Sequence, residues 1–377
     1  MSYMKIIYTS FIILLVSCHT EDINLFPQPT NPEKAIRITK IDWDTIVMEH
    51  IESSYLDKSG ITQNNDLFFI DTYYCYFFTF DTLGNFKHRY LGQGRAPHET
   101  TAGKIAGYTL LPDGDLFLLG FQLDHHVYDS TFNLKKTFFL ERNKSTDITK
   151  TSAIYTHQYD RLACKNYNDN VYFNMYSEHP NLDYIAQTDR YMKKCRHISE
   201  VNIQTEADGR MLGGGYPEFY KSNPLKFLVF SGINFDIDNQ GNVYVSYEAD
   251  SLIYKYDFDY TPLLSFGFSE KNMNTGYKKI NSYKECRKYH DEERKNKGYY
   301  GWLQYINETN TLFRSYTKGD KENSDGLQIY ENIILIGDVP VPKTLKIAGY
   351  IKPYYYSQAI IDEEKEQMII YRFKLPG

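Results

Sequence analysis

Acidic, histidine and aromatic residues concentrate in a few polar turns and long connections, and these residues are the best suited to bind a ligand. Carboxylate oxygens can hold a divalent cation such as Ca²⁺, and aromatic rings can stack on a sugar. Taken singly, each residue is equally well explained by ordinary turn chemistry. As a set they predict a binding rim made of Asp124, His125, Glu178, His179, Tyr216, Glu218, Glu248, Asp250 and Trp302.

The sequence lacks the motifs of several enzyme classes. It contains no G-x-S-x-G, no H-E-x-x-H and no Walker loop. The segment Phe235–Asn242 is similar to part of a calcium-binding loop, but its twelfth position, counted from Asp236, is Tyr247 where that loop needs a bidentate Glu. We therefore expect a turn there. The sequence does not identify a cofactor or a bound metal. If a metal binds, the acidic turns would suit a divalent cation such as Ca²⁺.

The start of the chain is typical of an exported lipoprotein. Lys5 precedes the apolar run Ile6–Val16, which is too short to span a bilayer as a helix. The run ends in Leu-Val-Ser-Cys, which resembles the bacterial lipobox, so Cys18 is the expected lipidation site. The alternative is a signal peptide with an incidental cysteine. We predict a signal peptide over 1–17, a lipidated tether over 18–34 and an outer-membrane location, with the leaflet left open.

Composition narrows the class of protein further. The chain has 377 residues and a formal net charge of −6, which argues against a nucleic-acid partner because phosphates attract basic surfaces. Its 36 Tyr and 23 Phe favour half-buried β-strands. Four cysteines follow the lipobox, and no C-x-x-C supports a zinc site. Their disulfide state stays open, with free buried thiols favoured for Cys75, Cys164, Cys195 and Cys286.

One pattern recurs along the chain, and it predicts the elements that would position the rim. A polar turn leads into a short apolar strand, in several copies followed by further strands, at intervals of roughly 50–70 residues. The copies begin at Leu67, Leu116, Val171, Val243, Thr311 and Met368. We predict an all-β, six-bladed β-propeller over 35–377, closed by pairing of the N-terminal segment Ala35–Ile41 with the last blade. The alternative is a β-sandwich or another all-β domain with hairpins.

The loop Leu91–Glu99, with the sequence LGQGRAPHE, resembles the G-x-G-x-G-P-G-E loop of the six-bladed β-propeller lipoproteins of Bacteroidetes. Its matching residues are Gly92, Gly94, Pro97 and Glu99, while Ala96 and His98 replace two glycines. The closing segment Ala359–Phe373 is also similar to a C-terminal feature of related propellers. The resemblance implies the fold and the membrane address. We interpret the loop as structural, because no helix follows it to bind a phosphate.

Two long inserts would share one face of the propeller with the predicted rim. They are the Gly-rich segment Asp208–Tyr220 and the charged, helical segment Lys284–Lys297. We predict a lipid-anchored, non-enzymatic binding module that takes a carbohydrate or an envelope protein on this face. The alternatives are a metal-dependent hydrolase or lactonase with a divalent ion near the channel, and a structural subunit of an envelope assembly.

Overall fold

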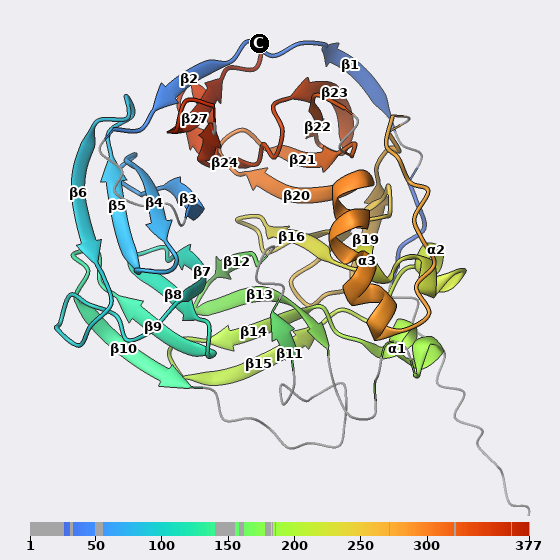
Figure 1. Ribbon diagram of the computed structural model, residues 1–377, viewed down its shortest axis with the longest axis horizontal. Helices are drawn as coiled ribbons and strands as arrows, with labels where there is room; N and C mark the ends of the chain where they lie inside the picture. Colours follow the sequence, from blue (N-terminus) through green and yellow to red (C-terminus); the bar gives the residue numbers. More distant parts are fainter. Residues whose placement is uncertain are drawn as a thin grey trace, which may run out of the picture.

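The structure is a six-bladed β-propeller. The computed structural model describes residues 26–30, 33–49, 56–139, 155–157, 162–177, 182, 184, 186–270, 272–319, 322–362 and 364–376. Over these residues the strands form six sheets arranged in a ring, seen along its axis in Figure 1. The predicted fold class is therefore confirmed.

The first three blades follow one another along the chain, and each runs from the axis outward along the sequence. The first blade contains β3 (Leu56–Ile61), β4 (Leu67–Asp71), β5 (Tyr76–Phe80) and β6 (Phe86–Leu91). The second contains β7 (Ile105–Leu110), β8 (Leu116–Gly120), β9 (Asp124–Tyr128) and β10 (Leu134–Phe139). The third contains β11 (Tyr155–His157) and β12 (Cys164–Tyr167), which pair with successive parts of β13 (Asn170–Ser177), and then β14 (Ile198–Asn202) and β15 (Ala207–Leu212).

The last three blades keep the same order and accept two strands from the start of the chain. The fourth contains β16 (Ile233–Ile237), β17 (Val243–Tyr247), β18 (Ile253–Tyr256) and β19 (Pro262–Phe266). The fifth contains β20 (Tyr299–Ile306), β21 (Thr311–Thr317), β22 (Asp325–Glu331), β23 (Ile334–Val341) and β1 (Lys34–Ile38). The sixth contains β24 (Ile347–Ile351), β25 (Tyr354–Ser357), β26 (Ile360–Asp362), β27 (Gln367–Phe373) and β2 (Asp44–Val47).

An N-terminal strand closes the ring, but a different segment from the predicted one. The outer strand of the sixth blade is β2, which pairs antiparallel with β27. Most of the predicted segment, Ala35–Ile41, instead lies in β1, which pairs in parallel with β23 of the fifth blade. Gly337 makes room there, since a Cβ built on it would lie 3.0 Å from the Cβ of Ile38. Part of the predicted tether is also packed, because Phe26 contacts Tyr254 at a ring distance of 5.3 Å.

The apolar strand that recurs in the sequence is expected to be the first strand of each blade, but the structure shows that it is usually the second. Five of the six copies lie in β4, β8, β13, β17 and β21, while the copy at Met368 lies in β27, the third strand of the sixth blade. Strands β4, β8 and β17 are buried along their whole length because each is covered by a neighbouring blade on both faces. Second strands therefore carry the strongest apolar signal.

Aromatic and aliphatic side chains fill the space between blades. Between the first and second blades, Phe68, Phe77, Leu118 and Tyr128 belong to one buried cluster. Phe68 and Phe77 stack with ring centroids 4.6 Å apart. Similar clusters join the second blade to the third and the first to the sixth. Because each blade is held by both neighbours, the inner strands are fixed in position around the axis.

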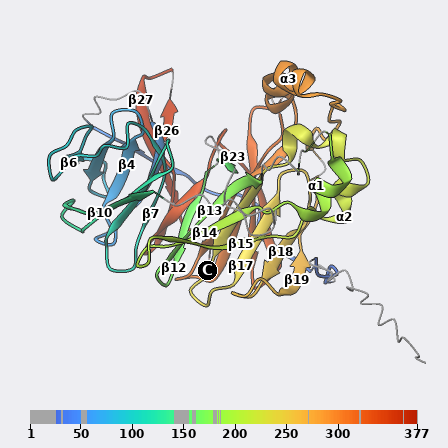
Figure 2. The ribbon, with the colours of Figure 1, turned by 90° about the horizontal axis from the view of Figure 1, so that it is seen from below.

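Three α-helices in the described part of the chain interrupt the blades. They are α1 (Thr188–Lys194) between β13 and β14, α2 (Glu218–Lys221) between β15 and β16, and α3 (Tyr283–Asn296) between β19 and β20. All three connections leave the sheets at the same end, and Figure 2 shows α3 above the ring. The predicted helical insert is confirmed, and Ser282 caps it by accepting the amide of Glu285 at 3.2 Å. None of the described helices is both long and apolar enough to cross a membrane.

Candidate functional site

A cavity of about 350 Å³ lies along the propeller axis, and we call it the channel cavity. All six innermost strands, or the residue just before one, contribute to its wall: β3, β7, β12, β16, β20 and β24. Asn307, in the turn between β20 and β21, also lines it. Such turns lie at the end of each sheet opposite to the helices, so the cavity reaches the face that carries no insert. Its polar and aromatic wall includes Lys58, Tyr108, Lys165, Asp236, Trp302 and Lys346.

Lys165 of β12, in the third blade, is held in place by one residue of the fourth blade and one of the fifth. Its Nζ lies 3.0 Å from Oδ1 of Asp236 and donates a 3.0 Å hydrogen bond to Oε1 of Gln304. Asp236 also accepts the amides of Ile237 at 2.9 Å and Tyr305 at 2.7 Å. Because its two oxygens already have three protein partners, Asp236 acts as a fixed counter-charge for Lys165.

Trp302 presents an indole ring to the cavity from the middle of β20. Its Nε1 donates a 2.9 Å hydrogen bond to the carbonyl of Ile347, which fixes the ring against the sixth blade. The Nζ of Lys165 lies 5.6 Å from the ring centroid, and the Nζ of Lys346 lies 5.3 Å from it. Both lysines are thus within range of a cation–π contact with the same ring. The wall therefore combines an aromatic surface with N–H donors.

Cys164 is the thiol in this wall. Burial raises its pKa to about 12, and the positive charges of Lys58 and Lys165 oppose this only in part. At neutral pH the group is therefore a protonated thiol and a poor nucleophile. Cys75, Cys164, Cys195 and Cys286 are all free cysteines.

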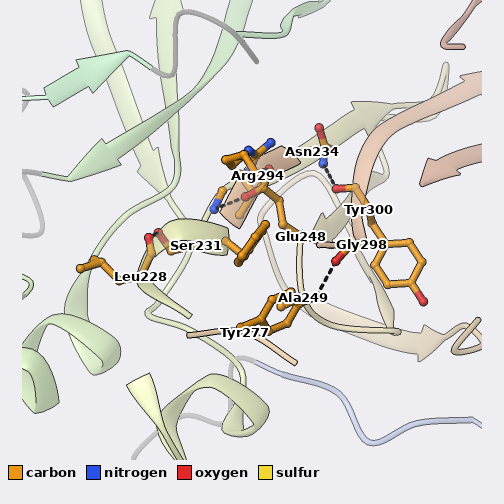
Figure 3. Close-up of polar contacts among 12 residues, drawn as sticks. Leu228, Ser231, Asn234, Glu248, Ala249, Tyr277, Arg294, Gly298 and Tyr300 are labelled. Carbon is orange, nitrogen blue, oxygen red and sulfur yellow. Dashed lines mark hydrogen bonds and ion pairs between the residues drawn. The ribbon is translucent and has the colours of Figure 1, made fainter. Parts of the chain in front are cut away.

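Glu248 of the predicted rim belongs to a buried structural contact, shown in Figure 3. Its Oε1 lies 2.8 Å from Nη1 of Arg294 in α3, and its Oε2 accepts the amide of Gly232 at 3.1 Å. The Glu248 side chain is fully buried, and the guanidinium of Arg294 stacks 3.8 Å from the centroid of the Tyr299 ring. This ion pair attaches the inserted helix to the fourth blade.

The other rim residues of the fourth blade and its insert also lie away from the channel cavity. Asp250 is buried, and it accepts the amide of Leu252 at 3.0 Å and the hydroxyl of Tyr254 at 2.7 Å. Burial raises its pKa. Tyr216 is fully buried and donates a 2.8 Å hydrogen bond to the carbonyl of Ser231. Glu218 begins α2, and its side chain is 87% exposed.

In the second blade, the predicted pair Asp124 and His125 is buried at the start of β9. Oδ2 of Asp124 lies 2.6 Å from Nε2 of His126. The ring of His125 stacks on Phe138 at 4.8 Å, and burial lowers the pKa of this imidazole to about 4. The pair thus belongs to the packing between strands and does not face the channel cavity.

Two predicted rim residues, Glu178 and His179, lie outside the described residues, as does the predicted lipidation site Cys18. In the loop that carries the resemblance, the Glu99 carboxylate folds back over Gly94, and its Oε2 accepts the amide of Ala96 at 2.9 Å. A Cβ on Gly94 would lie 1.8 Å from that oxygen. The carboxylate therefore occupies space that only a glycine leaves open.

Among the described members of the predicted rim, the channel cavity includes Trp302 alone. Sequence reasoning missed Lys58, Lys165 and Lys346, which lie in or next to inner strands. Each is a single lysine in a short strand or turn, a pattern that local sequence does not distinguish from a surface position. In the described residues, no three or more His, Cys, Asp or Glu side chains are grouped so that they could hold a metal ion.

Comparisons with known proteins show the fold and no more. No protein-family model matches the sequence, and no curated protein matches it either. The structure is similar to a crystal structure of a DUF4221 family member from Bacteroides vulgatus, with a TM-score of 0.65 and 11% identity over 89% of this chain and 97% of that one. The chain thus resembles a Bacteroidetes protein in its propeller fold.

Two further solved structures are less similar. U3-55K has a TM-score of 0.48 and 10% identity over 91% of this chain and 100% of that one. The holo form of the PQQ domain of pyranose dehydrogenase from Coprinopsis cinerea has a TM-score of 0.49 and 8% identity over 92% of this chain and 98% of that one.

Proposed function

We propose that this protein is a lipid-anchored, non-enzymatic binding module of the outer membrane, and that a carbohydrate binds in its channel cavity. The observation that carries the proposal is the placement of Trp302 in the cavity wall, with the Nζ atoms of Lys165 and Lys346 at 5.6 Å and 5.3 Å from its ring centroid. A sugar ring offers C–H groups to an aromatic face and hydroxyl oxygens to N–H donors. The wall offers both kinds of group.

The size and stiffness of the cavity also favour a small ligand. A volume of about 350 Å³ lies at the lower end of the range of small-molecule sites. Its wall is made of strands held by neighbouring blades, so a ligand would meet a preformed site with little cost of ordering. A folded protein partner would need a larger surface outside the cavity.

The metal-dependent hydrolase remains the alternative function. It would need carboxylates or imidazoles with lone pairs available to a divalent cation. Asp236, which lines the cavity, already has three protein partners, and the Cys164 thiol is neutral at physiological pH. These contacts support a binding role over catalysis at this wall.

The first test of the binding proposal is the substitution Trp302→Ala. We expect it to weaken binding of any glycan that the wild type binds by about tenfold or more, because the stacking surface is lost. The affinity would be measured by titration calorimetry against a glycan panel. Trp302→Phe keeps an aromatic face but loses the hydrogen bond to Ile347, so its affinity should be intermediate.

Trp43 provides the matched control. It is the other of the two tryptophans, and it packs against Tyr371 and Phe373 at the outer part of the sixth blade. Trp43→Phe should leave glycan affinity unchanged and make Trp302 the only indole, so that binding can be followed by its fluorescence. Equal affinity for Trp302→Ala and wild type would place the ligand outside the channel cavity.

The proposed lipid anchor rests on the lipobox that ends at Cys18, and the packing of the segment after it indicates which edge of the propeller would lie near the membrane. Thr30 donates its amide to the carbonyl of Ser265 at 2.9 Å, so the chain is attached to the outer strand β19 of the fourth blade. Cys18 precedes Phe26 by eight residues, which can span at most roughly 30 Å. A lipid on Cys18 would therefore keep this edge of the propeller close to the membrane.

Cys18→Ala is expected to move the protein from the membrane fraction to the soluble fraction of the cell that makes it. Without the lipid, the protein loses the acyl chains that would hold it in the bilayer. Fractionation and mass determination of the mature N-terminus check this, with Cys286→Ala as the control for loss of a thiol. Retention of Cys18→Ala on the membrane would contradict the anchor.

A further inference from the structure

We infer that the ligand of the channel cavity carries an acidic group, a carboxylate, sulfate or phosphate, which Lys165 and Lys346 bind beside Trp302. The inference rests on the proposed function and narrows it to an acidic carbohydrate. It depends on two observations: the ammonium groups of Lys165 and Lys346 lie near the Trp302 ring, and that of Lys165 is fixed by protein partners.

Two ammonium groups from distant positions in the sequence lie near the same indole ring. Lys165 comes from β12 in the third blade and Lys346 from the residue just before β24 in the sixth. Their Nζ atoms lie 5.6 Å and 5.3 Å from the centroid of the Trp302 ring. A sugar stacked on this ring would therefore have N–H donors of two lysines near its substituents.

Lys165 is positioned before any ligand arrives. Its side chain is 15% exposed, and it is fixed by Oδ1 of Asp236 and Oε1 of Gln304, each at 3.0 Å. These contacts use two of the three N–H donors of an ammonium group, which leaves a donor for a ligand. A charge held in a partly desolvated wall attracts an anion more strongly than one in bulk water.

Lys58 of β3 adds a third ammonium group to the wall, from the first blade. Among the described residues that line the cavity, three are lysines and one, Asp236, is an acid. An ammonium group that has a protein partner still has other N–H donors, so the lysines need not be unpaired to bind an anion. Charge-assisted hydrogen bonds from such groups are stronger than neutral ones.

A neutral sugar would use this wall less well than an acidic one. Its hydroxyl oxygens can accept hydrogen bonds from the lysines, but they bring no charge to offset the desolvation of the ammonium groups. A carboxylate, sulfate or phosphate on the same sugar supplies that charge. The geometry therefore discriminates between sugars by charge as well as by shape.

The test compares each acidic sugar with a neutral sugar of the same length. Trigalacturonate is paired with galactotriose, glucose 6-phosphate is paired with glucose, and inorganic phosphate reports on anion binding without a sugar. We expect at least one acidic sugar to bind about tenfold or more tightly than its neutral partner, since one charged hydrogen bond contributes about that much. The advantage should shrink as salt is added.

The variant that tests the site is Lys346→Gln, which keeps most of the side chain and removes the charge. It should weaken binding of the acidic sugar by about tenfold and binding of the neutral sugar by a clearly smaller factor, because glutamine keeps an N–H donor but carries no charge. Its matched control is Lys374→Gln in the same blade. Lys374 is exposed, its Nζ lies 4.6 Å from the centroid of the Tyr354 ring, and neither residue lines the channel cavity. Thermal unfolding of both variants shows whether the fold is retained.

The outcomes separate this inference from the proposed function. Equal affinity for the acidic and the neutral sugars, lost in Trp302→Ala, would overturn the inference and leave the carbohydrate function standing. Binding of inorganic phosphate with no binding of any sugar would overturn the carbohydrate function and support anion recognition. An acidic preference that Lys346→Gln does not reduce would overturn the assignment to this wall.

Discussion

Arg294→Met is expected to lower the free energy of unfolding by about 3–5 kcal/mol, because it leaves the buried carboxylate of Glu248 without its charged partner. The contact at risk is the 2.8 Å ion pair, drawn in Figure 3. The Glu248 side chain in it is fully buried. Methionine fills much of the volume of the arginine stem, so lost packing contributes little. Urea unfolding monitored by circular dichroism measures the effect.

A double variant and a surface variant make this prediction specific. Arg294→Met combined with Glu248→Gln should recover much of the lost stability, since no charge is then left buried. Arg287→Met, at an exposed position of the same helix, should change the stability by less than about 0.5 kcal/mol. Equal losses for Arg294→Met and Arg287→Met would mean that the ion pair contributes nothing to the attachment of α3.

Acidification from pH 6.5 to pH 4 is expected to destabilise the propeller by several kcal/mol. Burial lowers the pKa of His125 and of His197 to about 4, from an ordinary value of 6.5. Between these values the unfolded chain binds protons that the folded chain excludes, so stability falls as the pH falls. Each histidine contributes about 3 kcal/mol to this loss by linkage, and neither contributes above the ordinary pKa.

Removing one imidazole tests the assignment through the slope of stability against pH. His125→Phe should reduce the acid-induced loss by about half, because the ring next to Phe138 no longer takes up a proton. His88→Phe, at an exposed position of β6, is the matched control. The buried carboxyl of Asp250 has a raised pKa and acts in the opposite direction, so the difference between variants is the decisive quantity. An unchanged slope in His125→Phe would contradict the prediction.

The polar turns show why the predicted rim and the structure differ. Asp and Glu are common in exposed turns, which is why the sequence predicts Glu248 and Asp250 as rim residues. Both do follow β17 in a turn, but both are buried. The inserted helix α3 supplies Arg294, which pairs with Glu248 in the buried contact. Whether a turn carboxylate faces solvent, a ligand or an inserted helix depends on residues far away in sequence, and the turn itself carries no sign of it.

The sequence by itself determined the all-β class and the number of blades. Strands such as β4, β8 and β17 are buried along their whole length and mostly apolar because they are covered on both faces, and a run of about five residues is enough to show this. It also predicted the helical insert, since the Ser282 cap and the charged run that follows are local features.

Only the tertiary structure decided the composition of the channel wall. Lys58, Lys165, Trp302 and Lys346 belong to four different blades, and they meet because the ring closes through β2 and β27. The innermost strands line a polar cavity, so a lysine in one of them looks in the sequence like a lysine at an exposed strand position. These residues are far apart in sequence, and only closure of the propeller ring brings them together. The repeat pattern of the sequence therefore does not predict their contact.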